Sequence, residues 1–140
     1  MGYYSQVTIQ IQDKGYEMLK KSMDEYNEGF GGFFIPDRIL RRDRDCGTDY
    51  IIQWDSIQWC PDHNDILSVE SVLDKLKSMT TKGEAPDGYR FCKIRIGEEV
   101  NDIHIDFNDW SYREDGIYWQ ASVPIPNGFE ACQQQGELNV

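Results

Sequence analysis

Residues 65–79 carry the clearest amphipathic pattern in the chain. Their apolar side chains recur at helical spacing: Ile66, Val69, Val72, Leu73, Leu76 and Met79. A helix with such a stripe must bury it against another element of the fold. A second helix is predicted over 13–27, where Tyr16, Leu19 and Met23 share one face. The chain therefore needs a further surface that receives two helices.

Alternating residues predict that this surface is a sheet. Apolar and polar residues alternate over 6–12, which is typical of a half-buried strand. Further strands are expected at 49–59, 88–97, 103–107 and 117–123, whereas the charged segment 36–45 favours no particular structure. Strands with one polar face favour antiparallel pairing. We expect an α+β fold, a mainly antiparallel sheet of about five strands with two amphipathic helices on one face. Residues 1–123 would form one domain, and 124–140 a loosely ordered tail.

Composition restricts the classes of function. The 140 residues contain 25 Asp and Glu against 14 Lys and Arg, a formal net charge of −11. That excess of negative charge disfavours direct binding to nucleic acid or to an anionic membrane, and it favours a basic protein partner. No segment has the length of a membrane span, and no secretory signal is recognised. Four widely spaced cysteines are expected to be reduced thiols in the cytoplasm.

Motifs for catalysis are few. The sequence has no Walker loop, no Gly-x-Ser-x-Gly and no His-Glu-x-x-His, so we expect neither an enzyme nor a cofactor. Cys60 and His63 form only half of a metal-site pattern. Alternating residues Asp102, His104 and Asp106, with Asp109 nearby, could share a sheet face and hold a divalent cation. A metal-dependent nuclease is therefore the third alternative, although no metal site is predicted.

The most unusual feature is the acidic segment 98–115. It carries seven carboxylates opposed by Arg113 alone: Glu98, Glu99, Asp102, Asp106, Asp109, Glu114 and Asp115. One interpretation is a solvated hairpin edge whose charge prevents sheet-to-sheet aggregation. The other is a docking face for a basic groove that ordinarily holds nucleic-acid phosphates, with Trp110 and Tyr112 as anchors.

A second charged segment offers an alternative binding site. Arg38, Arg41, Arg42 and Arg44 alternate with aspartates and follow a Gly-rich aromatic loop at 29–34. The alternating signs favour surface ion pairs that neutralise each other. Guanidinium forks could instead hold a nucleotide or signalling molecule.

Two stretches resemble a family of small bacteriophage and prophage proteins. The opening Met1-Gly2-Tyr3-Tyr4-Ser5-Gln6-Val7 is similar to their Met-Gly-Tyr-Arg-Ser-x-Val, with Tyr4 in place of the arginine. The stretch from Gly88 to Glu99, followed by Asn101-Asp102-Ile103, looks like their Tyr-x-Phe-x-x-Ile-Arg-x-Gly-Glu and Asp-Ile. The resemblance would cover most of 1–107. It implies a phage or mobile-element origin and action inside a bacterial cell, and it carries over no catalytic residues.

Together these features predict a non-enzymatic, phage-encoded inhibitor of the anti-CRISPR or anti-defence type. It would act in the cytoplasm of the bacterial host as a monomer or homodimer. Its acidic face would occupy the nucleic-acid-binding groove of a basic host or defence protein.

Overall fold

The computed structural model describes residues 3–30, 34–45, 47–99, 101–109, 112 and 130–131. Over these residues the elements are β1 (Ser5–Gln12), α1 (Asp13–Phe30), β2 (Arg38–Arg44), β3 (Gly47–Ile57), α2 (Asn64–Ser78), β4 (Phe91–Ile96), β5 (Ile103–Phe107) and β6 (Glu130–Ala131). The described strands form one sheet in the order β5-β4-β1-β3-β2-β6. Every neighbouring pair is antiparallel. The predicted α+β class is confirmed.

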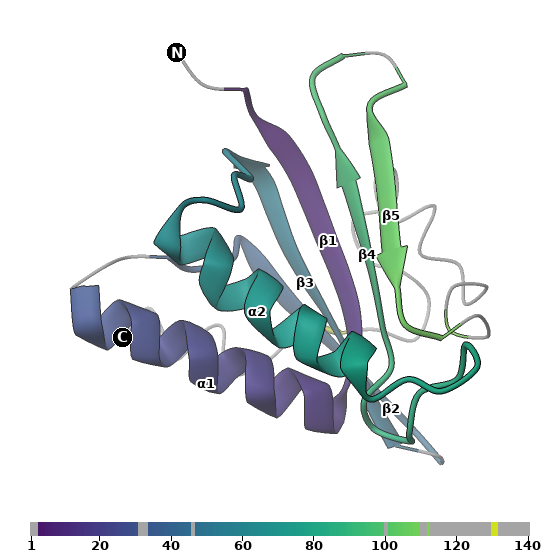
Figure 1. Cartoon of the computed structure of the whole chain (residues 1–140). Helices are drawn as coiled ribbons and strands as arrows, with labels where there is room; N and C mark the ends of the chain where they lie inside the picture. The colour runs from purple at the N-terminus through teal and green to yellow at the C-terminus, as the bar shows by residue number, and fades with distance from the viewer. Residues whose placement is uncertain are drawn as a thin grey trace.

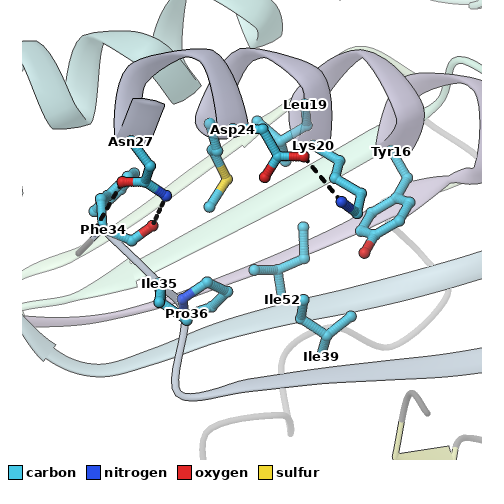
Figure 2. A pocket seen from close by; sticks show the side chains of 11 residues that line it. Tyr16, Leu19, Lys20, Asp24, Asn27, Phe34, Ile35, Pro36, Ile39 and Ile52 are labelled. Carbon is cyan, nitrogen blue, oxygen red and sulfur yellow. Dashed lines mark hydrogen bonds and ion pairs between the residues drawn. The ribbon is translucent and has the colours of Figure 1, made fainter. Parts of the chain in front are cut away.

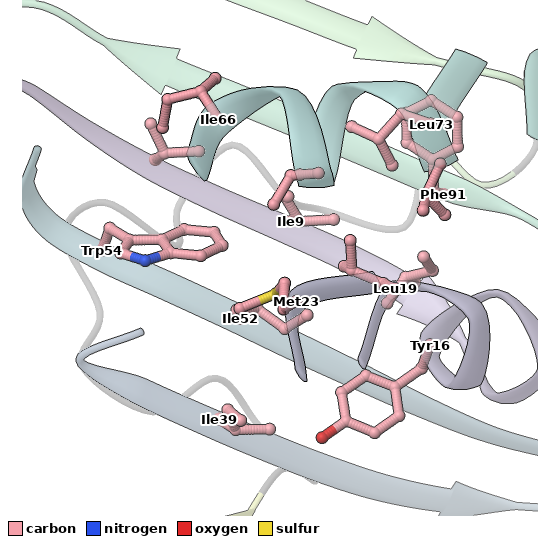
Figure 3. Packing of buried hydrophobic residues seen from close by; sticks show 14 of the residues in the cluster. Ile9, Tyr16, Leu19, Met23, Ile39, Ile52, Trp54, Ile66, Leu73 and Phe91 are labelled. Carbon is pink, nitrogen blue, oxygen red and sulfur yellow. The ribbon is translucent and has the colours of Figure 1, made fainter. Parts of the chain in front are cut away.

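Both helices lie on the same face of the sheet, as Figure 1 shows. The stripe predicted on 65–79 is buried there from Ile66 to Leu76, and the apolar positions of β1 and β3 meet it (Figure 3). Met79, also predicted on the stripe, follows the helix and is exposed. The central members of this core are Val7, Ile9, Ile11, Leu19, Ile52, Ile66, Val69, Leu73, Leu76 and Phe91. Removing this apolar surface from water is the main contribution to the stability of the fold. The β4–β5 hairpin extends beyond the area that the helices cover.

The opposite face of the sheet differs from the expectation of a solvated surface. Thr8, Gln10 and Gln12 of β1 alternate with the apolar positions, yet all three are buried. Cys92 and Ile94 of β4 lie on this face and are buried together with Tyr112. The central strand is therefore buried on both sides, and its polar side chains need partners within the protein.

Several boundaries differ from the prediction. Residues 38–44 form β2, which the alternation of Arg and Asp conceals because both are polar. Helix α1 continues to Phe30, so Gly29 lies within the helix and does not end it. The strand expected at 117–123 lies outside the described residues. Of the expected tail only Glu130–Ala131 is described, and it pairs with Leu40 and Arg41 of β2. The domain boundary at 123 stays a prediction.

No helix among the described residues combines the length and the apolar character that crossing a membrane requires.

Candidate functional site

The end of the β4–β5 hairpin gathers exposed acidic and apolar side chains. We call this surface the acidic tip, and it consists of Tyr3, Tyr4, Glu98, Glu99, Asp102 and Ile103. Glu98 and Glu99 are exposed, and neither forms an ion pair with a described residue. Tyr3, Tyr4 and Ile103 are 41%, 43% and 52% exposed. Exposed aromatic and apolar side chains beside charges are typical of protein-binding surfaces.

Hydrogen bonds hold the acidic tip together. They join the two residues before β1 to the turn between β4 and β5. The backbone N–H of Tyr4 donates to the carboxylate of Glu98 at 2.6 Å. The Tyr3 hydroxyl accepts the N–H of Glu99 at 3.0 Å and donates to the carboxylate of Asp102. Within the turn, Gly97 N–H donates to the carbonyl of Asp102 at 2.8 Å. The described residues of the turn and the residues preceding β1 are therefore joined in one hydrogen-bonded unit.

Asp102 is the electrostatic centre of this unit. Its carboxylate accepts from Arg95 at 3.1 Å, and the Nε2 of His104 lies 3.1 Å away. The hydrogen bond from Tyr3, with the charge of Arg95 beside it, lowers the pKa of Asp102 below its ordinary value. The same bond raises the pKa of the Tyr3 hydroxyl, because ionisation would place two negative groups in contact. Asp102 is therefore a fixed carboxylate that positions its neighbours.

A groove of about 580 Å³ runs from the acidic tip along β4, between the hairpin and α2. At its α2 side, Glu70 accepts a hydrogen bond from Trp59 Nε1 at 2.7 Å and from Lys93 Nζ at 2.5 Å. The Lys93 ammonium also lies 5.7 Å from the centre of the Trp59 ring. Arg95, His104 and Asp106 line the same groove. The groove therefore combines side chains of both charge signs with the aromatic ring of Trp59.

The remaining predicted acidic residues do not join the acidic tip. Asp106 forms an ion pair with Lys77 of α2 at 3.1 Å. Asp109, expected on an exposed face, is 3% exposed, and its carboxylate accepts from Ala85 N–H and Arg90 Nε. Buried carboxylates require such partners, so Asp109 stabilises a loop and is not available to another protein. Trp110, Glu114 and Asp115 lie outside the described residues.

Tyr112, predicted as an exposed anchor, is 4% exposed. Its hydroxyl donates to Asp49 at 3.1 Å, and burial raises the pKa of Tyr112 well above its ordinary value. Asp49 is itself 1% exposed and pairs with Arg42 at 3.2 Å and Arg44 at 2.6 Å. Tyr112 therefore belongs to a buried polar cluster on the second face of the sheet.

The arginines of the alternative ligand site all have carboxylate partners. Arg38 pairs with Asp55, and Arg41 pairs with Asp43 at 3.1 Å. Arg42 and Arg44 both contact the buried Asp49. A ligand at this segment would have to compete with these carboxylates.

The candidate metal residues are not brought together. The His63 N–H donates to the carbonyl of Cys60 at 2.9 Å, which is a backbone turn. Asp102 and His104 are in contact, but Asp106 pairs with Lys77 and Asp109 is buried elsewhere. Among the described residues, no three His, Cys, Asp or Glu side chains are arranged to hold a metal ion.

Sequence reasoning missed Tyr3 and Tyr4. The register that places Gln6 of β1 opposite Ile96 of β4 brings these tyrosines beside the turn 97–102. The spacing of neighbouring residues does not reveal such a pairing between distant strands. The only feature of the sequence that pointed to these tyrosines was the presence of two large side chains directly before a predicted strand. Comparison with known proteins found no matching family model, no matching curated protein and no matching solved structure.

Proposed function

We propose that this protein is a non-catalytic inhibitor that inserts its acidic tip into a basic, nucleic-acid-binding groove of a host or defence protein. The observation that supports this most is the position of Glu98 and Glu99. Both are exposed at the end of a projecting hairpin, and Tyr3, Tyr4 and Ile103 expose apolar surface beside them. Carboxylates would occupy the positions of phosphates, and the aromatic rings would supply apolar contact area.

The rigidity of the acidic tip supports a binding role. Tyr3 fixes the turn through Glu99 and Asp102, so little conformational freedom is lost when a partner binds. Preorganisation of this kind reduces the entropic cost of association. The net charge of −11 would also attract a positively charged partner over long distances and would make association sensitive to salt.

The proposed biological setting rests on the resemblance to phage and prophage proteins. It supports action in the bacterial cytoplasm, where nucleic-acid-binding defence complexes are the natural basic partners. Because the surface that we propose is limited to the acidic tip, one copy of the chain is sufficient for binding.

The test compares two double charge reversals with the same net charge. Glu98→Lys with Glu99→Lys changes the acidic tip, and Glu17→Lys with Glu28→Lys changes two exposed positions of α1. Each protein is immobilised and exposed to a purified panel of bacterial DNA- and RNA-binding effectors at increasing salt concentration. We expect the wild type and the α1 variant to retain an effector that duplex DNA displaces, and the tip variant to lose it. Equal retention by both variants, or retention by none of the three proteins, would overturn the proposal.

A further inference from the structure

A hollow lies between α1 and the chain that leads into β2 (Figure 2). Its volume is about 100 Å³, and its walls are mainly apolar. The side chains that enclose it come from three parts of the fold: Tyr16, Leu19, Met23, Pro36, Ile39 and Ile52. None of them belongs to the acidic tip, so this is an independent site.

Both ends of the hollow are fixed by contacts within the protein. At one end the Asn27 side chain donates to the Phe34 carbonyl at 3.2 Å and accepts the Phe34 N–H at 3.0 Å. The Phe34 ring then stacks on Trp54 with 5.4 Å between the ring centres. At the other end the Tyr16 ring stacks on the Tyr50 ring, with 3.8 Å between the ring centres. Side chains held in this way cannot easily collapse into the hollow, so the space persists.

Three polar side chains at the rim are already engaged. Lys20 forms an ion pair with Asp24 at 2.9 Å, and the Asn27 amide is bonded to Phe34 at both its nitrogen and its oxygen. A charged ligand would therefore have to break one of these contacts in order to gain a partner. An apolar ligand needs no such exchange, and it would cover apolar side chains of a hollow that is partly open to solvent.

We propose that the hollow binds a small apolar molecule that contains a single ring. An engineered apolar cavity of about 150 Å³ is known to bind benzene, and the volume here is of the same order. A flat ring also loses less conformational freedom on binding than a flexible chain does, which favours a ring. This site would give the protein a ligand-dependent stability that is separate from partner binding.

Toluene and benzoate are the probes for this proposal, because they share a ring and differ in charge. Toluene added to the methyl-labelled wild type is expected to shift the signals of Leu19, Ile39 and Ile52 and to raise the melting temperature. Ile94, on the other face of the sheet, serves as the internal control and should not move. Benzoate at the same concentration should leave all four signals in place. The proposal would be overturned if toluene caused no shifts, or if it shifted Ile94 as much as the other three residues. Equal shifts with benzoate would overturn it as well.

Filling the hollow provides an independent test. Ile39→Phe and Met23→Phe each place a ring in the space, and Leu67→Phe adds a ring at an exposed position of α2 as the matched control. Circular dichroism identifies the variants that retain the native fold. Toluene should stabilise Leu67→Phe as it does the wild type, and it should lose this effect in a folded Ile39→Phe or Met23→Phe. A filled and folded variant that responds normally to toluene would contradict the assignment, and the wild-type shifts decide the question if neither variant folds.

Discussion

The hydroxyl of Tyr3 donates a hydrogen bond to the carboxylate of Asp102, a residue 99 positions further along the chain. This contact joins the segment before the central strand β1 to the turn between β4 and β5. The same hydroxyl accepts the N–H of Glu99 and so controls the position of the exposed acidic residues. The shape of the acidic tip therefore depends on one phenol group.

Tyr3→Phe removes that hydroxyl and should raise the pKa of Asp102 toward its ordinary value. The hydrogen bond from Tyr3 is the largest cause of the lowered pKa, and Arg95 would remain as a weaker one. Carboxyl carbon signals followed by NMR during an acid titration measure this change directly. Tyr4→Phe is the matched control, because Tyr4 contacts Glu98 through its backbone N–H, which phenylalanine retains. An unchanged Asp102 pKa in Tyr3→Phe would show that the hydroxyl does not hold this carboxylate in solution.

Gly97→Ala should disturb the same contact by steric overlap. A Cβ atom at Gly97 would overlap the Oδ2 of Asp102 and the hydroxyl of Tyr3. The two side chains would have to move apart, so we expect the loss of their hydrogen bond, about 0.5–1.5 kcal/mol in the free energy of unfolding. Gly29→Ala is the control, because nothing lies within 4 Å of a Cβ there and α1 continues through the position. Urea denaturation should show this variant to be more stable by about 0.5–1 kcal/mol, the helical advantage of alanine over glycine. Equal stability of the two variants would argue against the close packing at Gly97.

The lowered pKa of Asp102 also predicts how stability depends on pH. A carboxyl group whose pKa is lower in the folded state stabilises the protein fully above its unfolded pKa, and this contribution is lost as pH falls through the folded value. Wild type should therefore exceed Asp102→Asn in stability at about pH 6, and the difference should shrink toward about pH 2. Thermal unfolding of both proteins at a series of pH values measures this difference in stability. A difference that does not depend on pH would mean that Asp102 contributes through packing and not through its charge.

The elements that bury apolar stripes could be predicted from the sequence, because periodicity reports directly on burial. The stripe Ile66 to Leu76 and the alternation over 6–12 indicated α2 and β1 almost to the residue. The strand β2 was missed because Arg41 and Asp43 on one face, and Arg42 and Arg44 on the other, make both alternating positions polar. The strand forms because it pairs with β3, the next strand along the chain, and with the distant Glu130–Ala131.

The candidate site was predicted less well, because exposure of a charge depends on what the fold places beside it. Asp109 and Glu98 look alike as sequence, yet one meets Arg90 in a buried loop and the other remains at a turn. The pairing of Lys77 with Asp106 joins α2 to β5 and also has no local signal. Ile103 is an apolar residue of a predicted strand, yet at the end of β5 it is 52% exposed.

Asp49→Asn should destabilise the second face of the sheet strongly. The buried carboxylate accepts from Arg42, Arg44 and Tyr112, so its neutralisation removes one charge that faces two guanidinium groups. Breaking a buried ion pair in this way costs about 3–5 kcal/mol. Asp43→Asn, at the exposed pair with Arg41, should cost under about 1 kcal/mol. Chemical denaturation of both variants compares them, and similar losses would mean that the Asp49 cluster is hydrated in solution.

Glu70 and Lys93 should be strongly coupled in a double-mutant cycle. Their side chains are 16% and 10% exposed and are joined at 2.5 Å, and Glu70 also accepts from Trp59. Glu70→Ala leaves the ammonium and the indole N–H without their acceptor, at a cost of about 1–3 kcal/mol for each unsatisfied group. Lys93→Met alone removes the ammonium but retains the stem of the side chain. With both substitutions the losses should not add, and the interaction energy should be about 0.5–3 kcal/mol. The fluorescence of Trp59 should change in both single variants, because Glu70 accepts from its indole N–H and the Lys93 ammonium lies over its ring. Additive losses would show that the two charges are screened by solvent in the groove and act independently.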